Sequence, residues 1–552
     1  MYYFHVRTKK DLNFVILIAS GAITTLIITP NLNKDSMVIP KLIFLFGTAV
    51  FFLPTVVRSW ISIKEFKYLK QFFYLSFILT FLSIAILVNS DSPIEQLLYG
   101  RSGRGLGYIT FFSSLVLMLI SSLLISLHNL RVLIAGLAIS GIVTCVYAVF
   151  QFFGLDFFNW DTKTNGIVST LGNPNFQSSF AAMVFWPLII FIYKYKYKYI
   201  NIFFAVMLIF ATIYVSKSTQ GYIGISVAIL VFSLIFFWYR LRVIAFIVGI
   251  LTVSIGVIAI FGMLGHGPLS QYLYKISVQS RGDFWRSAFA TGNSNPIFGV
   301  GFDSFGDYFL MHRDSIAASH DFAEYTDSAH NYFLDYLVNG GYPFLIINIL
   351  LILLVLRTFY LNQRVVAKFD SNLAALFCAW IIFLLQSIIS PIGIPFLIWN
   401  SIISGSVIGL ASIRMNSQEL SLIPDMKFKL KSSQFLFLVF GLIILFPYYN
   451  SDRMQLEAMQ TGDGDLLIKA VTSYPESVLK YNQAGRDLLT SGLPEQSLFI
   501  ARKAVEFNPN SAALWSIILA NPIAPVEERN VAKQIILKLD PLNSKVRNLE
   551  IK

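Results

Sequence analysis

The sequence predicts an all-α protein, a polytopic membrane helical bundle of about 13 spans with a large outer-face loop and a small C-terminal α-helical repeat domain. Of its 552 residues, 56% are hydrophobic and only 13% are charged, whereas soluble domains carry about 25% charged residues. Many windows of roughly 18 to 22 residues contain no charge, and a helix of that length spans about 30 Å of hydrocarbon. The polar and apolar alternation of a transmembrane β-barrel does not occur.

Thirteen apolar segments are expected to cross the membrane. In chain order they are 13–29, 42–57, 72–88, 108–127, 132–153, 176–193, 200–215, 222–239, 243–264, 332–356, 373–389, 396–413 and 435–448. The first segment lacks a convincing signal-peptidase site and is expected to remain as a span. Because the number of spans is odd, the two ends of the chain are expected on opposite sides of the membrane.

The net charge of +12 is interpreted as a topology signal. If the N-terminus lies inside, the inner loops hold 20 Lys and Arg, the outer loops 10 and the tail beyond residue 450 another 12, which together make 42. Positive residues collect on the cytoplasmic side of membrane proteins. We therefore expect a multi-pass protein of the cytoplasmic (inner) membrane, with its N-terminus inside and its C-terminal domain outside. The inner clusters are Lys64/Lys67/Lys70, Lys194/Lys196/Lys198 and Lys427/Lys429/Lys431.

Several partner classes are not expected. The basic and aromatic run 193–199 lies between two predicted spans, so it should anchor the chain at the membrane interface and not bind nucleic acid. Cys145 and Cys378 lie inside apolar spans, which argues against a disulfide framework or a cysteine-based metal site. Phosphate-loop, dinucleotide and zinc-protease signatures do not occur. We expect no cofactor, no metal and no nucleic acid, and we expect contacts with membrane lipids.

One polar stretch, residues 280–341, interrupts the apolar sequence. In a chain that mostly faces hydrocarbon, converging polar groups mark the functional site. We therefore expect an outer-face catalytic loop over residues 265–331. Four of the six histidines lie in the polar stretch or just before it, and these are His266, His312, His320 and His330.

Two segments of this loop carry candidate catalytic residues. Residues 276–289 are predicted to form an amphipathic helix on the outer face, with Trp285 and Phe289 dipping into the interface. On that helix, Arg281 either snorkels beside lipid headgroups or holds a lipid-linked diphosphate through a bidentate fork.

The second segment is Asp327-Ser328-Ala329-His330-Asn331. Asp327 is expected to cap the helix that becomes the tenth span. The cap would place His330 in the first helical turn at the outer surface, where free backbone amides favour an anion. His330 is then either an interfacial residue or a catalytic one.

Other outer loops hold candidate substrate-binding residues. Arg101 and Arg104 lie in a glycine-rich loop and either bind phosphate or anchor the loop at headgroups. Asn173 precedes a proline, which favours a structural reading as a helix start. Lys217 and Gln220 lie in a tight turn between two spans, where polar residues are needed in any case.

The composition becomes that of a soluble domain beyond Asn450, which predicts a membrane domain over 1–450 and a soluble domain over 451–552. Pro475 and Pro509 are 34 residues apart, the period of tetratricopeptide repeats. Too few clean repeats are present for a stable solenoid, so packing against the bundle is expected. We expect a docking or spacing element that is separable from the chemistry and that offers a surface to a protein partner.

Several of these blocks, in this order, resemble the O-antigen ligase/polymerase superfamily, including members with tetratricopeptide tails. The blocks are Arg101–Gly107, Gly172–Phe176, Arg281 with Trp285, Asn295–Gly301, and Ala329-His330-Asn331-x-x-Leu334-x-x-Leu337 with Gly341. Such proteins are integral-membrane glycosyltransferases that take glycan from an undecaprenyl-diphosphate carrier and transfer it to an acceptor hydroxyl. The resemblance covers most of residues 90–345.

The resemblance implies a metal-independent glycosyltransferase with a polyprenyl-diphosphate-linked glycan donor, acting at the outer face of the cytoplasmic membrane. It implies that Arg281 grips the diphosphate and that His330 acts at the reacting centre, with Asn173 and Asn331 among the substrate-binding residues. The acceptor stays open between a lipid core, a growing polysaccharide and a protein hydroxyl, so ligase, polymerase and protein O-oligosaccharyltransferase are all alternatives.

The chain departs from the family pattern at the turn between two spans. It has Gln220 where the ligases often carry a second diphosphate arginine, so Arg101, Arg104 or Lys217 would have to supply that charge.

A flippase or transporter of lipid-linked glycans is an alternative from another class. A transporter should carry charged residues deep in its spans, whereas here the spans are nearly free of charge and polarity collects on one face. A third alternative, a membrane scaffold for the repeat domain, leaves the polar stretch unexplained.

Overall fold

The computed structural model describes residues 9–60, 63, 66–158, 160, 167–320, 325–366, 368–416 and 432–551. Within these ranges the fold is helical and contains no strand, which confirms the predicted class. Each predicted span falls on one helix: α1 (Lys9–Leu26), α2 (Val38–Ser59), α3 (Lys67–Asn89), α5 (Tyr108–Leu124), α6 (Leu130–Phe152), α7 (Pro174–Ile192), α8 (Lys198–Val215), α9 (Thr219–Arg240), α10 (Arg242–Met263), α15 (Tyr332–Val366), α16 (Ser371–Ile389), α17 (Ile394–Asn416) and α18 (Ser432–Thr461). Eleven of these are long and apolar enough to cross a membrane, while α1 and α5 are shorter apolar helices.

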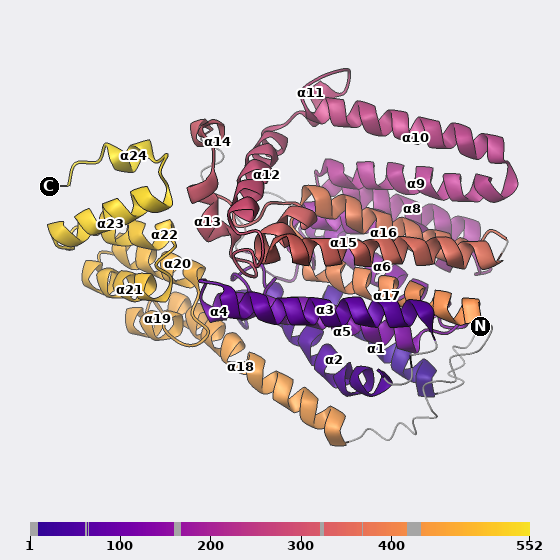
Figure 1. The fold of residues 1–552 in the computed structure, drawn as a ribbon, viewed down its shortest axis with the longest axis horizontal. Coiled ribbons are helices and arrows are strands. Elements are labelled where there is room, and N and C mark those ends of the chain that lie inside the picture. Colours follow the sequence, from indigo (N-terminus) through magenta and orange to yellow (C-terminus); the bar gives the residue numbers. More distant parts are fainter. Residues whose placement is uncertain are drawn as a thin grey trace.

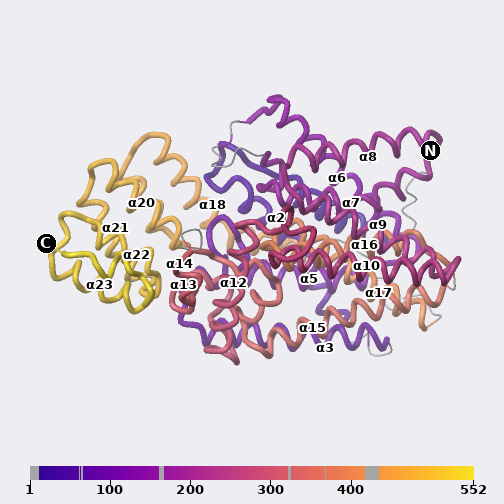
Figure 2. The backbone as a smooth tube through the Cα atoms, turned by 90° about the horizontal axis from the view of Figure 1, so that it is seen from above, coloured from indigo at the N-terminus to yellow at the C-terminus, as the bar shows by residue number. Residues whose placement is uncertain are grey.

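The spans lie side by side along the long axis of the molecule (Figure 1). Five further helices lie in the loops between spans: α4 (Ile94–Tyr99), α11 (Ser270–Leu273), α12 (Ile276–Ser294), α13 (Phe305–His312) and α14 (Ser315–Ser319). Figures 1 and 2 show α12, α13 and α14 at the same end of the bundle as the C-terminal helices, opposite the first described residues. The polar loop and the tail therefore share one end of the molecule.

Helix α17 forms the centre of the bundle, with 94% of its apolar window buried. It packs closely against α5 because two glycines four residues apart face that helix. A Cβ atom at Gly405 would lie 1.9 Å from the carbonyl oxygen of Met118, and one at Gly409 would lie 2.1 Å from that of Ser122. Small residues at this spacing let helix backbones approach in a membrane, where van der Waals packing drives helix association.

A break in α15 explains the glycine at position 299, where a Cβ atom would lie 2.2 Å from the carbonyl oxygen of Val338. Gly340 and Gly341 interrupt the helical geometry of α15, and Gly341 has a φ of 69°. The freed backbone pairs with the loop, since the Val300 N–H donates to the carbonyl of Val338 at 2.8 Å. The loop that leads into the polar site is thus fastened to the span that follows the site.

The tail consists of short helices with their own hydrophobic core. They are α19 (Gly464–Val471), α20 (Val478–Thr490), α21 (Pro494–Phe507), α22 (Ala512–Ala520), α23 (Val526–Leu539) and α24 (Ser544–Arg547). Helix α20 packs on α21, and α22 packs on α23. The tetratricopeptide assignment of these pairs stays a prediction.

The tail contacts the polar loop at both ends of α13. The Asn508 amide donates to Asp307 at 3.2 Å, and Arg313 forms a two-pronged ion pair with Asp540, with N–O distances of 2.9 to 3.1 Å. The side chains of this ion pair are almost fully buried, with 9% and 3% exposed. The expected packing of the tail against the bundle is therefore present, and it reaches the loop that holds the candidate site.

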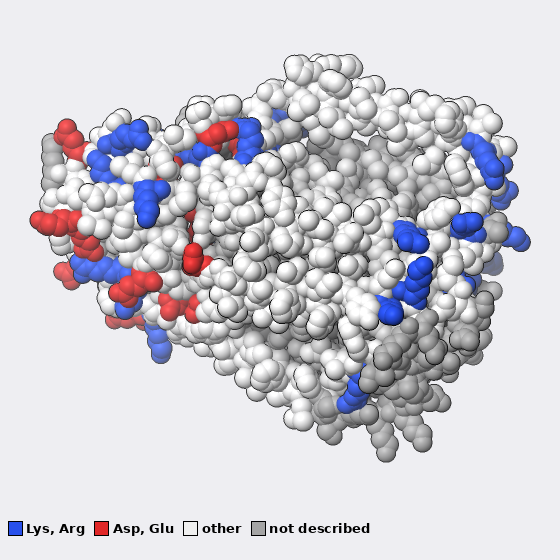
Figure 3. Space-filling view, viewed as in Figure 1, with Lys and Arg blue, Asp and Glu red and all other residues white. Residues whose placement is uncertain are grey.

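Charge is distributed unevenly along the molecule. In Figure 3, Lys and Arg without Asp or Glu mark the end of the visible face opposite the tail, whereas both signs mix over the tail. Lys64, Lys427, Lys429 and Lys431 lie outside the described residues. This asymmetry is the one that the positive-inside rule associates with a cytoplasmic end.

We expect reporter fusions to place the polar loop and the tail in the same, exported compartment. Fusions after Met311 and after Pro475 should both score as exported, and a fusion after Lys196, at the basic end, should score as cytoplasmic. The physical reason is the odd number of spans together with the basic inner loops. Opposite compartments for Met311 and Pro475 would contradict the span count.

Candidate functional site

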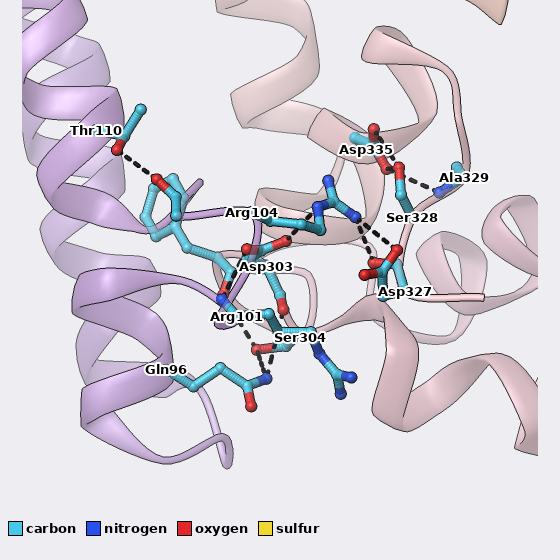
Figure 4. A network of polar contacts seen from close by, with 12 residues as sticks. Gln96, Arg101, Arg104, Thr110, Asp303, Ser304, Asp327, Ser328, Ala329 and Asp335 are labelled. Atoms are coloured by element: carbon cyan, nitrogen blue, oxygen red, sulfur yellow. Dashed lines mark hydrogen bonds and ion pairs between the residues drawn. The ribbon is translucent and has the colours of Figure 1, made fainter. Parts of the chain in front are cut away.

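A network of arginines and carboxylates joins the glycine-rich loop to the polar loop (Figure 4). The Arg101 guanidinium pairs with Asp307 and also donates to the Tyr325 hydroxyl. The Arg101 backbone N–H donates to Asp303 at 2.8 Å. Burial disfavours the Arg101 cation, but Asp307 and Tyr325 outweigh burial and raise its pKa.

Arg104 completes this network from the same glycine-rich loop. It donates to the backbone carbonyl of Asp327 at 2.8 Å and lies 3.2 Å from the Asp327 carboxylate and 3.5 Å from that of Asp303. Although burial opposes ionisation of Asp327, the charges of Arg104 and Arg101 hold the pKa of that carboxyl below its usual range. This geometry favours a structural role for both arginines, and their predicted role as phosphate ligands stays a prediction.

A cavity of about 50 Å³ opens beside this network. Its polar wall includes Arg104, Asp303, Asp327, Asp335 and Asn339, and its apolar wall includes Phe111, Phe302 and Leu397. Three carboxylates against one guanidinium give the wall an excess of negative charge. This charge would repel a phosphate group, so the cavity is not a favourable phosphate site.

His330 lies just before α15 and not in its first turn, so that expectation is wrong. The helix is capped by Asn331, whose side-chain oxygen accepts the N–H groups of Phe333 and Leu334 at 3.0 and 3.2 Å. Asp327, the expected cap, is held by Arg104 instead. Asn331 therefore has a clear structural function, and its role toward substrate is untested.

The ring of His330 is fixed by its neighbours. Its Nδ1 lies 3.1 Å from the carbonyl oxygen of Ser328. Because a carbonyl can only accept a hydrogen bond, we assign the proton of the neutral ring to Nδ1, which leaves the lone pair on Nε2. The ring lies beside Phe284, with centroids 5.4 Å apart. Burial lowers the pKa of His330, and the nearby charges of Arg104 and Arg281 lower it further, so the ring is neutral at pH 7.

Arg281 differs from Arg101 and Arg104 in the groups that hold its side chain. It extends from α12 and donates to two backbone carbonyls, those of Ile389 and Ser277. No carboxylate among the described residues lies within ion-pair distance of it. Burial lowers the pKa of Arg281 from its usual value, although an arginine remains charged.

The helix that carries Arg281 is longer than predicted and packs differently. Trp285 is partly buried against the core of the loop itself, which includes Phe284 and Phe309, so it packs on protein. Its expected contact with the membrane interface stays a prediction. Phe289 is 52% exposed, as an interfacial residue would be. Contact with α15 explains the difference, because it provides an apolar surface for one face of α12.

Gln220 lies next to the attachment point of Arg281. Its amide donates to the Ser390 hydroxyl at 2.8 Å, and Ile389, one residue earlier, is the carbonyl that holds Arg281. The starts of α9 and α12 thus meet at the end of α16. Lys217, in the same turn as Gln220, is exposed.

Asn173 lies at a helix start, as its position before a proline predicted. Its side chain caps α7 and accepts the N–H of Asn175 at 2.8 Å. A role of Asn173 in substrate binding stays a prediction.

Sequence reasoning missed the acidic partners of the site. Asp303 and Asp307 hold the two buried arginines, and Asp335 contacts the turn that carries His330. A second histidine of the loop, His320, lies 2.9 Å from the buried Asp283. These carboxylates could have been found from the sequence, because acidic residues are rare near the predicted spans. An ionisable group at such a position is usually paired or functional.

Residues 204–349 match the family model described as O-Antigen ligase. The matched segment includes Arg281, His330 and Asn331, whereas Arg101, Arg104 and Asn173 precede it. The chain matches none of the curated proteins with which it was compared. The family match supports the O-antigen ligase superfamily for this multi-pass membrane protein, and with it a glycan-transfer role of the glycosyltransferase type in polysaccharide biosynthesis.

Proposed function

We propose that this protein transfers glycan from an undecaprenyl-diphosphate carrier to an acceptor hydroxyl at the outer face of the cytoplasmic membrane. The observation that carries the proposal is the pair formed by two residues. His330 has its Nδ1 held by Ser328, which leaves the lone pair on Nε2, and Arg281 has no carboxylate within ion-pair distance among the described residues. Both residues lie in the segment that matches the ligase family, and the Arg281 cation is close enough to His330 to help lower the pKa of its ring.

The proposed reaction is a displacement at the anomeric carbon of the donor sugar. The acceptor oxygen forms a bond to that carbon while the bond from carbon to the diphosphate oxygen breaks. The acceptor proton passes to Nε2 of His330, which is neutral and therefore able to act as a base. Negative charge grows on the leaving diphosphate, and N–H donors of Arg281 stabilise it. The site also accelerates the reaction by holding the acceptor hydroxyl in line with the bond that breaks in the donor.

Gln220 is the favoured candidate for the second group near the diphosphate. Its amide is neutral, but it lies beside the attachment point of Arg281. Arg101, Arg104 and Lys217 are the other candidates from the sequence. Both arginines are already paired with carboxylates, and Lys217 is exposed in the same turn as Gln220. The proposal thus has one cation and a neutral hydrogen-bond donor at the leaving group.

Two measurements test the function. Purified protein in lipid nanodiscs should transfer glycan from a polyprenyl-diphosphate donor to an acceptor, at a rate that a metal chelator leaves unchanged. Deletion of the protein from its host should leave glycan on the carrier: full-length polymer indicates a ligase, and single repeat units indicate a polymerase. Absence of transfer together with carrier lipids trapped on the inner leaflet would instead indicate a flippase.

A further inference from the structure

We infer that Asp335 is a positioning residue that holds His330 in its reactive orientation through Ser328, an inference that rests on the proposed function. Asp335 lies in the first turn of α15, where an acid is favoured by the helix dipole. It lies close to the polar network of the site, and Figure 4 shows its carboxylate beside Ser328 and Ala329.

The carboxylate of Asp335 reaches back to the turn that precedes its own helix. One oxygen accepts the backbone N–H of Ala329 at 2.9 Å. Both oxygens lie near the Ser328 hydroxyl, at 3.2 and 3.1 Å. Because an ionised carboxylate only accepts, the single hydroxyl proton of Ser328 is committed to Asp335.

Ser328 in turn contacts His330 twice. Its hydroxyl oxygen accepts the backbone N–H of His330 at 3.0 Å, and its carbonyl accepts the ring N–H at Nδ1, 3.1 Å away. His330 has a φ of 55°, in the left-handed region that residues other than glycine adopt only when surrounding contacts hold them there. These contacts are the ones that Asp335 and Ser328 supply.

The consequence for chemistry is a fixed tautomer. With the Nδ1 proton donated to Ser328, only Nε2 can accept a proton from an acceptor hydroxyl. In many hydrolytic and transfer enzymes, a third side chain holds the catalytic base in its reactive orientation. Here the carboxylate of Asp335 orients His330 indirectly, because Ser328 lies between them.

The first test is Asp335→Asn in the full-length protein, measured in the transfer assay. We expect kcat to fall about 10- to 100-fold, as when the outer partner of a functional histidine is removed, with the donor KM within about twofold of wild type. Asp370→Asn is the matched control. Asp370 caps α16 at the opposite end of the bundle, accepting the N–H of Asn372 at 3.0 Å, and its loss should leave kcat and KM unchanged.

Double variants separate positioning from a general structural role. Ser328→Ala should lower kcat like Asp335→Asn, and the two together should cost little more than either alone, because they break the same chain of contacts. In the His330→Ala background, Asp335→Asn should cause no further loss. If Asp335→Asn lowers the residual rate of His330→Ala by the same factor as in wild type, the inference is overturned.

A readout that does not need activity completes the test. Diethyl pyrocarbonate modifies neutral histidine rings, and mass spectrometry follows each site. Asp335→Asn or Ser328→Ala should raise the modification rate of His330 about fivefold, the effect of one lost hydrogen bond, and leave the rate at exposed His266 unchanged. An unchanged rate at His330 in both variants overturns the inference. Failure of the wild-type protein to transfer glycan would overturn the proposed function alone.

Discussion

His330→Ala is expected to lower the rate of glycan transfer by about 10²-fold or more, the range in which a general base contributes. The loss should appear in kcat, because Nε2 is proposed to act on the acceptor proton during the reaction and not on the bound donor. Transfer by the purified protein, at saturating donor and acceptor, measures it. His266→Ala, in the same outer loop but exposed, is the matched control and should be near wild type.

The pH dependence of the same assay identifies the base. The pKa of His330 lies below its usual value of about 6.5. A base must be neutral, so the wild-type rate should be flat above neutral pH and should fall as the pH drops through that lowered pKa. His330→Ala should lack this acid limb. A limb that persists in the variant would assign the proton transfer to another group.

Arg281→Lys is expected to cost on the order of 10²-fold in kcat although the charge is kept. A guanidinium binds a phosphate through two parallel N–H groups, and an ammonium cannot reproduce that fork. The substitution also removes the Nε donor that fastens the side chain to the Ile389 carbonyl.

Arg286→Lys is the matched control for Arg281→Lys. Arg286 lies on the same helix, but its guanidinium pairs with Asp283 and Asp314. Its replacement should change transfer by less than about threefold, because lysine keeps the charge that Asp283 and Asp314 pair with. Equal rates for both variants would reduce Arg281 to an interfacial anchor.

The sequence determines the spans because each one is specified locally. A charge-free segment of sufficient length must form a helix in hydrocarbon, since its backbone has no other hydrogen-bond partners there. Counting these segments, together with the basic loops, also placed Arg281 and His330 at one face. In the structure the Arg281 cation is close enough to His330 to help lower the pKa of its ring, although the two residues are almost 50 positions apart.

Long-range pairing could not be predicted in the same way. Arg101 and Asp307 are separated by 206 positions, and no local pattern links them. The N-terminal cap of α15 could not be predicted from local sequence either, because Asp327 and Asn331 are both good capping residues. Which of them caps α15 depends on Arg104, whose guanidinium holds Asp327.

The contacts at the two ends of α13 make the tail and the site thermodynamically linked. Asn508 and Asp540 hold α13 from the tail side, and Asp307 at its first turn also holds Arg101. Any substrate that displaces α13 therefore works against the Arg313–Asp540 pair. Linkage between binding sites is reciprocal. If a partner protein binds the tail more tightly in one position of α13, bound partner changes the affinity for substrate by the same factor by which bound substrate changes the affinity for the partner.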